Sequence, residues 1–263
     1  MIEIRNISKT YDKGSKALKD IDIRIQDGEF VFIMGRSGSG KSTLIRLLLK
    51  EAEPSSGRII VNDMALQKMP RRYIPKYRRR LGVVFQDFRL LKDRTVFENV
   101  AFAQRVVGAS PRKIREEVPR MLKLVGLSSK YKSFPHQLSG GMLQRIMIGI
   151  AMSMGPSLLI ADEPTTAIDA ITQFDILNEF AAIKQKHKTA MIFISHDLNA
   201  VSQIADKIVV LNQGTVVDQG DFHHIIHHAA DPYTRLLIEK RTDVMRKYRQ
   251  ALEGGECSHA QAG

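Results

Sequence analysis

The sequence of 263 residues contains one cysteine, no tryptophan and no long hydrophobic run. Cys257 alone cannot build a disulfide framework or a cysteine-based zinc or iron–sulfur site. The longest apolar runs, residues 146–152 and 190–194, fall far short of the roughly 18 residues that a membrane-spanning helix needs. The first residues, MIEIRNISK, lack the hydrophobic region of a signal peptide. We therefore expect a soluble protein of a reducing, cytosolic compartment.

Positive charge exceeds negative charge, and the excess lies in one half of the sequence. The formal net charge is +12; residues 1–137 hold 29 Lys and Arg against 14 Asp and Glu, whereas residues 138–263 hold 11 against 14. Such asymmetry can mark a face for nucleic acid or for an anionic membrane. It also fits a chain whose two halves have different origins, so charge alone leaves the function open.

Short apolar runs alternate with helical patterns along the chain. Several runs are apolar on both faces, as strands of a buried parallel sheet require; they cover residues 29–35, 81–86, 157–162, 189–195 and 207–214. The alternation predicts an α/β fold with a mostly parallel core sheet. The first 30 residues and residues 57–63 are more typical of an antiparallel β flank. Residues 88–137 predict an inserted helical subdomain, in which Pro119 should start a new helix.

One glycine-rich stretch has the pattern of a phosphate-binding loop. It follows an apolar strand, precedes the helical run STLIRLLLK, and matches G-x-x-x-x-G-K-[ST] at Gly35, Arg36, Ser37, Gly38, Ser39, Gly40, Lys41 and Ser42, with Thr43 next. Glycines let backbone N–H groups converge on phosphate oxygens, and the helix N-terminus adds a favourable dipole. We expect Lys41 to neutralise the β- and γ-phosphates and Ser42 to bind Mg²⁺. The alternative is an ordinary Gly/Ser turn that leads into a helix.

A second chemical feature is the apolar strand LLIADE, which ends in Asp162 and Glu163. One carboxylate suits a water-mediated contact with Mg²⁺, and the next suits a general base for an attacking water. Alone the pattern is weak, because strand ends often carry solvated charges. Together with the phosphate loop it predicts a site that hydrolyses a nucleoside triphosphate.

With these motifs the chain resembles, over nearly its whole length, the nucleotide-binding subunit of ATP-binding cassette (ABC) proteins. LSGGM resembles the family signature, VVFQD its Q-loop with Gln86, TAID its D-loop with Asp169, and ISHD its switch with His196. Tyr11 stands where the family has an aromatic residue that stacks on adenine, although an aromatic residue after a short strand is also commonly a packing residue. Met142 stands where the broad family usually has Gln and where peptide and nickel importers often have Met.

The resemblance implies ATP and Mg²⁺ as cofactors and a head-to-tail homodimer, or a pair with a paralogous ATPase subunit. The signature of one chain would then donate to the γ-phosphate held by the other through Ser139, Gly140 and Gly141. Gln86 would contact Mg²⁺ and the attacking water, His196 would contact the γ-phosphate, and Glu163 would polarise the water. The further partner would be an integral, permease-like membrane protein, with this chain peripheral on the cytoplasmic side of the cell membrane.

The family also implies a division of the chain into parts. Residues 1–87 and 157–240 would form the ATP-binding α/β core with its β flank, and residues 88–156 the helical subdomain with the signature. Residues 241–263 would be a charged helix and a disordered tail.

The resemblance to particular machines changes at the signature. Residues 1–137 resemble the bacterial cell-division ATPases of the FtsE type, and residues 138–263 resemble oligopeptide and nickel importer subunits, so we expect a mosaic. The surface around the Q-loop, where the family holds its membrane subunit, belongs to the first part and favours a division-type partner. A nucleic-acid role is the distant alternative, because such ABC ATPases generally have a long coiled coil or two cassettes and this sequence shows neither.

Two charged features stay open at this point. One is a run of seven basic residues that could meet anionic lipid, an acidic partner loop or only solvent: Lys68, Arg71, Arg72, Lys76, Arg78, Arg79 and Arg80. The other is HHIIHH at residues 223–228, whose i,i+4 histidine pairs could hold a metal on a helix, although solvated side chains are the favoured interpretation.

Overall fold

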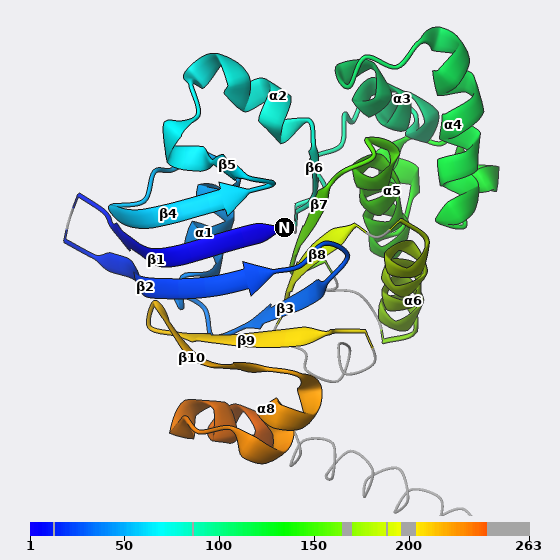
Figure 1. Ribbon diagram of the computed structural model, residues 1–263. Coiled ribbons are helices and arrows are strands. Elements are labelled where there is room, and N and C mark those ends of the chain that lie inside the picture. The colour runs from blue at the N-terminus through cyan, green and yellow to red at the C-terminus, as the bar shows by residue number, and fades with distance from the viewer. Residues whose placement is uncertain (13, 86, 165–169, 188, 196–203, 241–263) are drawn as a thin grey trace, which may run out of the picture.

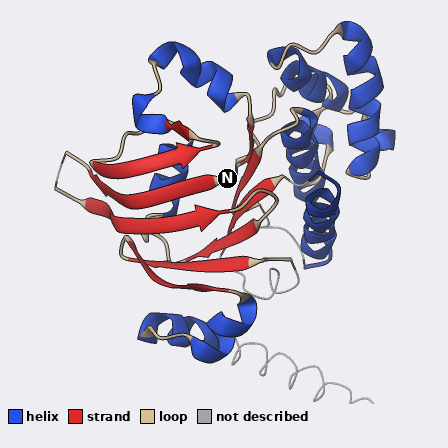
Figure 2. Cartoon of the chain, in the orientation of Figure 1, coloured by secondary structure: helices blue, strands red, loops and turns tan. Residues whose placement is uncertain are grey.

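The computed structural model describes residues 1–12, 14–85, 87–164, 170–187, 189–195 and 204–240. Figure 1 shows strands stacked in two layers on one side of the molecule and a group of helices on the other. Figure 2 shows the same division by type of secondary structure. The fold is α/β, as predicted, with a mostly parallel core sheet and an antiparallel flank.

The core sheet has six strands in the order β10-β9-β3-β8-β7-β6. They are β3 (Phe30–Met34), β6 (Leu81–Val84), β7 (Leu158–Asp162), β8 (Ala190–Ile194), β9 (Lys207–Asn212) and β10 (Thr215–Gly220). All neighbours pair in parallel except β9 and β10, which are antiparallel. The carboxyl ends of β3, β6, β7 and β8 therefore meet at one edge of the sheet, where ligands bind in open α/β folds.

The second sheet is the antiparallel flank, with strand order β2-β1-β4-β5. Its strands are β1 (Ile2–Thr10), β2 (Lys16–Ile25), β4 (Ser56–Val61) and β5 (Met64–Ala65). In β2 the residues alternate between buried and exposed over Ile21–Ile25, because one face covers the core and the other meets water.

The helices are α1 (Lys41–Leu48), α2 (Ile74–Arg78), α3 (Val96–Val106), α4 (Pro111–Leu124), α5 (Gly140–Ser153), α6 (Ala170–His187) and α8 (Phe222–His228), and residues 232–240 are also helical. Short 3-10 turns occur at Leu66–Lys68, Arg71–Tyr73, Ser128–Lys130 and Pro135–Gln137. Among the described residues no helix is long and apolar enough to cross a membrane.

Strand β3 belongs to two hydrophobic cores at once. Phe30, Phe32 and Met34 pack with the helices α3 to α6, whereas Val31 and Ile33 pack with α1 and the antiparallel flank. All five side chains are buried, since successive residues of a strand point to opposite faces and both faces are covered. The strand that leads into the phosphate loop is thus held by packing on both faces.

The prediction for Pro119 is wrong. Helix α4 runs from Pro111 to Leu124 without a break and contains Pro119 in its interior. Ile114, Val118 and Met121 lie buried on both sides of the proline, and Pro119 itself is exposed. Packing of this face holds the helix together, while the carbonyl group that loses its partner can bond to water.

Candidate functional site

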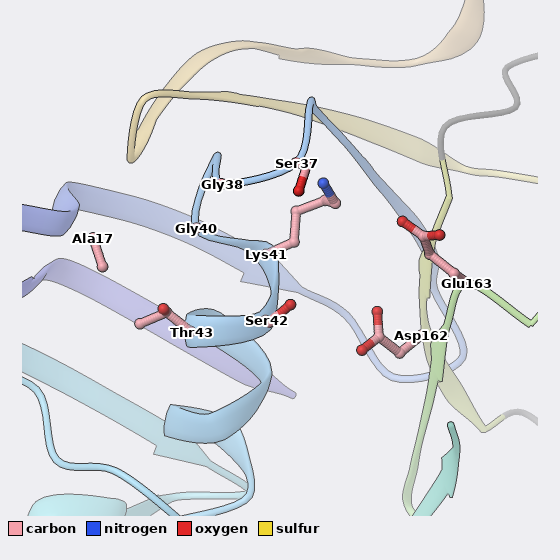
Figure 3. A pocket seen from close by; sticks show the side chains of 9 residues that line it. All are labelled: Ala17, Ser37, Gly38, Gly40, Lys41, Ser42, Thr43, Asp162 and Glu163. Atoms are coloured by element: carbon pink, nitrogen blue, oxygen red, sulfur yellow. The ribbon is translucent and has the colours of Figure 1, made fainter. Parts of the chain in front are cut away.

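A cavity of about 480 Å³ lies at the carboxyl edge of the core sheet. Figure 3 shows it between the loop after β3 and the end of β7. Its lining residues are Ala17, Ser37, Gly38, Gly40, Lys41, Ser42, Thr43, Asp162 and Glu163. The structure therefore brings the predicted phosphate loop and the predicted acidic pair together around one space, although Asp162 lies 121 positions after Lys41 in the sequence.

Close packing explains two of the glycines in the loop. A Cβ at Gly35 would come within 2.3 Å of the Leu211 carbonyl oxygen, and one at Gly40 within 2.7 Å of the Ala17 carbonyl oxygen. Gly40 also has φ of +106°, which side chains disfavour, and it ends the loop at the start of α1. The loop thus packs closely on the strands beside it, and its backbone faces the cavity.

Lys41 crosses beneath the loop instead of extending into solvent. Its Nζ donates to the carbonyl oxygens of Gly35 at 2.7 Å and Arg36 at 2.9 Å. Burial lowers the pKa of Lys41, and the negative charges of Glu163 and Asp162 oppose that change. An ammonium group has three N–H donors, so one remains for a phosphate oxygen when two are used by the loop.

The acidic pair lies opposite this ammonium group. Burial and the neighbouring charge of Glu163 raise the pKa of Asp162, while Lys41 opposes the rise. Glu163 has φ of +46°, an uncommon conformation for a residue other than glycine, and its N–H donates to the Ile194 carbonyl oxygen at 2.9 Å. Backbone strain of this kind is concentrated at functional sites. Here it turns the carboxylate toward the cavity that Figure 3 shows.

Of the remaining loop residues, Ser39 and Arg36 do not line the cavity. Ser39 is only 4 % exposed, and its N–H donates to the Arg36 carbonyl oxygen at 3.1 Å, so it holds the loop together. The Arg36 N–H donates to the Tyr233 hydroxyl at 2.9 Å. Sequence reasoning missed Tyr233 because it lies 197 positions along the chain from Arg36.

Tyr11 lies next to the cavity but is not part of its lining. Its hydroxyl is 3.4 Å from the Thr43 Oγ1, and the Lys9 ammonium lies 5.1 Å from the centre of its ring. The ring is partly buried. The position at the rim is compatible with contact to a base, and the role of Tyr11 stays a prediction.

The signature segment is separate from this cavity. Ser139 caps α5, its Oγ accepting from the Met142 N–H at 3.4 Å, and Gly140 and Gly141 form the first turn of the helix. Ser139 and Gly140 are exposed. The site of one chain thus contains the loop and the acidic pair but not the signature.

Three predicted residues, Gln86, Asp169 and His196, lie outside the described residues. Sequence reasoning also missed Ala17, which lines the cavity from β2, and Asp87, whose charge raises the pKa of Asp162. Asp87, three positions after the end of β6, could have signalled an acidic group there, because β6 lies beside β7 in the sheet.

The two open features of the sequence lie elsewhere. In α8 the rings of His223 and His227 are 4.7 Å apart between centroids, and both residues are exposed. The described part of the chain contains no group of three His, Cys, Asp or Glu residues that could hold a metal ion. The basic run at residues 68–80 is exposed at all seven charged positions, and Arg78 donates to the Leu49 and Lys50 carbonyl oxygens at the end of α1.

A glycine-rich loop between a buried strand and a helix, facing an acidic pair on a parallel strand, defines a P-loop nucleoside triphosphatase. The profile of the ABC transporter family matches residues 18–166, and this chain belongs to that family. It is an ABC-type ATPase, the nucleotide-binding subunit of a transporter-type complex, which confirms the predicted class, fold and enzyme activity.

Relatives of two kinds match most of the chain. The methionine import ATP-binding protein MetN of Helicobacter pylori is 36% identical over 243 residues, which are 92% of this chain and 74% of that protein. The cell division ATP-binding protein FtsE of Bacillus subtilis is 40% identical over 217 residues, which are 82% of this chain and 95% of that protein. The resemblance to division-type ATPases is thereby confirmed, and at 217 residues it extends beyond residues 1–137. An importer ATPase is similar over most of the chain as well, and the mosaic stays a prediction.

Solved structures agree with this fold. A dimeric ATP-binding cassette in a post-hydrolysis state, bound to ADP and Pi, has a TM-score of 0.76 and 30% identity and covers 84% of this chain and 98% of its own. CbiO1 of Clostridium perfringens, part of the ABC transporter complex CbiONQ, has a TM-score of 0.81 and 27% identity and covers 96% of this chain and 98% of its own.

Proposed function

We propose that this chain hydrolyses ATP with Mg²⁺ in a head-to-tail dimer and drives a membrane partner from the cytoplasmic side of the cell membrane. The observation that carries the proposal is the cavity in which the Lys41 ammonium group faces Asp162 and Glu163 while the signature lies exposed outside it. The loop and the acidic pair would form one half of an ATP site, and the exposed signature would complete the site of another chain.

The phosphates of ATP fit the N-terminal end of the cavity. The first N–H groups of α1 have no acceptor within the helix and point toward the loop. They would donate to phosphate oxygens, and Lys41 would add its remaining N–H donor between the β- and γ-phosphates. Tyr11 at the rim would stack on adenine.

Glu163 is the proposed general base. Water attacks the γ-phosphorus in line with the bond to the β–γ bridging oxygen, that bond breaks, and the carboxylate of Glu163 takes the proton of the water. ADP keeps the bridging oxygen and inorganic phosphate leaves. The strained backbone at Glu163 fixes the carboxylate before ATP arrives, so that little reorganisation is needed during the reaction.

The cavity also suits a magnesium ion. The Ser42 hydroxyl and the Asp162 carboxylate both line it, and both are oxygen donors of the kind that Mg²⁺ prefers. Burial and the charge of Glu163 raise the pKa of Asp162 and so disfavour its charged form, which a bound cation would favour. Gln86 is the third proposed ligand. When bound, the ion would neutralise charge on the β- and γ-phosphate oxygens.

The second half of the site is proposed to come from the other subunit. Ser139, Gly140 and Gly141 would donate to the γ-phosphate across the dimer, since α5 begins there with its positive dipole end exposed. Asp169 and His196 would complete the contacts. A paralogous subunit with its own signature could replace the second copy.

Within this assembly we assign residues 1–87 and 157–240 to ATP binding, residues 88–156 to the helical subdomain and residues 241–263 to a charged tail. A shallow groove of about 570 Å³ lies on the helical part and supports contact with the membrane partner there. Its lining combines aromatic and charged side chains: Asp93, Thr95, Phe97, Glu98, Tyr131, Lys132 and Phe134.

A division-type membrane protein is the proposed partner, because the groove lies on residues 93–134, within the part of the sequence that resembles FtsE. An importer permease is the second candidate. It is favoured by the match to the methionine import ATPase, which extends over 92% of this chain against 82% for FtsE. Within the importer class, the sequence of residues 138–263 suggested oligopeptide or nickel cargo.

Replacement of the general base tests the chemistry. Glu163→Gln should keep ATP binding, trap the closed dimer and lower turnover by roughly 100-fold or more, because the amide cannot take a proton from water. Phosphate release and size-exclusion chromatography with ATP measure the two effects. Undiminished hydrolysis would refute the role of Glu163.

Co-purification tests the partner. The full-length chain, tagged and expressed with each class of membrane protein, should retain the division-type partner. A Tyr131→Ala variant should weaken that capture, since Tyr131 is 44% exposed in the groove. Capture by an importer permease alone would replace the first candidate with the second.

A further inference from the structure

We infer that Tyr233 is a positioning residue of the phosphate loop and makes ATP affinity depend on the C-terminal helix at residues 232–240. The inference rests on the proposed assignment of the loop as the phosphate site. Tyr233 lies beyond residues 18–166, which the family profile matches. The inference starts from one backbone contact: the Tyr233 hydroxyl accepts the N–H of Arg36 at 2.9 Å.

The peptide units at residue 36 are held from two directions. On one side the Arg36 N–H donates to Tyr233, and on the other the Arg36 carbonyl oxygen accepts from the Lys41 Nζ at 2.9 Å and from the Ser39 N–H at 3.1 Å. Tyr233 therefore helps to fix the carbonyl group on which Lys41 rests. Loss of the hydroxyl would let this part of the loop move and would leave the ammonium group less well placed for phosphate.

The ring of Tyr233 contributes a second, separable contact. The Arg36 guanidinium lies 5.7 Å from the ring centre, within the range of a cation–π interaction. Removal of the hydroxyl alone leaves this contact in place. A phenylalanine at this position therefore isolates the hydrogen bond to the loop.

The local sequence explains why Tyr233 occupies this place. Asp231 accepts the Tyr233 N–H at 2.8 Å, and Pro232 lies between them, so that acceptor, proline and tyrosine start the helix in a favoured order. Asp218 of β10 anchors the segment, its carboxylate accepting the N–H groups of Ala230 at 3.1 Å and Asp231 at 3.2 Å. Asp218 is only 8% exposed, so this anchor belongs to the folded core.

The phosphate loop is thus connected to β10 through the helix at residues 232–240. The C-terminal helix is fixed to the core by Asp218, and the loop is fixed to the helix by Tyr233. A partner or a chemical change that displaces residues 232–240 would loosen the loop and lower nucleotide affinity. This gives the helix a regulatory function at a site that it does not line.

Equilibrium titration of the full-length chain with ADP is the test. Tyr233→Phe should raise the Kd by about threefold to tenfold, the effect of losing one neutral hydrogen bond. It should raise the KM for ATP by the same factor and leave kcat within about twofold, because Tyr233 touches no reacting atom. The melting temperature without nucleotide should stay close to that of the unchanged protein.

Tyr77→Phe is the matched control. The buried Tyr77 hydroxyl donates to the Leu48 carbonyl oxygen at 2.7 Å, at the far end of α1 from the loop. Its loss should lower the melting temperature and leave the Kd unchanged, which is the behaviour of a purely structural tyrosine. A Kd rise below threefold for Tyr233→Phe, or an equal rise in both variants, overturns the inference. Failure of the unchanged protein to bind ADP would instead overturn the proposed function.

Discussion

Two helices of this protein begin with glycine-rich turns, and their surroundings differ. Helix α1 follows Gly40, which provides no side-chain cap, and its first residue Lys41 is buried under the loop. Helix α5 follows Ser139, whose hydroxyl caps it, and Ser139 and Gly140 are exposed. The first helix start faces two carboxylates across a cavity, whereas the second lies outside that cavity.

The two helix starts resemble each other in sequence but suit different tasks. A helix start without a side-chain cap leaves the first N–H groups of the helix to a ligand, and the packing around Gly35 and Gly40 keeps the preceding backbone in place without a cap. A capped and exposed helix start is stable by itself and can be presented to another molecule. The first arrangement suits binding within the chain, and the second suits completion of a site elsewhere.

The largest effect is expected when each helix start is disabled in a different copy of the chain. Lys41→Ala and Gly140→Asp homodimers should both be inactive, the first through loss of phosphate binding and the second through a charge that repels it. Mixed in equal amounts, they should recover about a quarter of the normal ATPase rate, because half of the dimers are mixed and each holds one intact site.

The recovered ATPase activity must depend on the exchange of subunits between the two variant homodimers. Light scattering should show dimers in the mixture, and a covalently linked Lys41→Ala dimer should give no recovery. The Gly140→Asp subunit keeps an intact phosphate loop, and the Lys41→Ala subunit keeps an intact signature. If mixed dimers form and are still inactive, the signature does not act across the dimer.

The close packing of the phosphate loop can be tested by comparing two of its glycines. Gly40→Ala should cost about 3 kcal/mol of unfolding free energy, since its Cβ would meet the Ala17 carbonyl oxygen at 2.7 Å and a Leu18 methyl group at 2.6 Å. In Gly38→Ala the added Cβ would have no atom within 4 Å. This change should cost about 1 kcal/mol of unfolding free energy, which is the strain of a side chain at positive φ. Urea unfolding without nucleotide measures both, and equal losses would mean that the loop is not held by its neighbours.

The sequence predicted those parts of the fold and site that depend on local pattern. Apolar strands, the phosphate loop and the acidic pair at Asp162 and Glu163 are visible because each is continuous in the chain. What escaped prediction depends on tertiary contact. Pro119 lies inside α4 because buried residues on both sides hold the helix, and Tyr233 reaches Arg36 only after β10 and the C-terminal helix have packed.

The serine cap of α5 has a counterpart at the start of α4. Ser139 and Ser110 both accept an N–H of the first helical turn, at 3.4 Å and 3.3 Å, and Ser110 starts α4 away from the cavity lining. Each change to alanine should cost about 1 kcal/mol of stability in thermal or urea unfolding, because one capping bond is lost. Only Ser139→Ala should lower the ATPase rate of the dimer, by about threefold to tenfold, since its hydroxyl would also donate to the γ-phosphate of the partner site. Equal ATPase rates for the two variants would mean that Ser139 serves only as a helix cap.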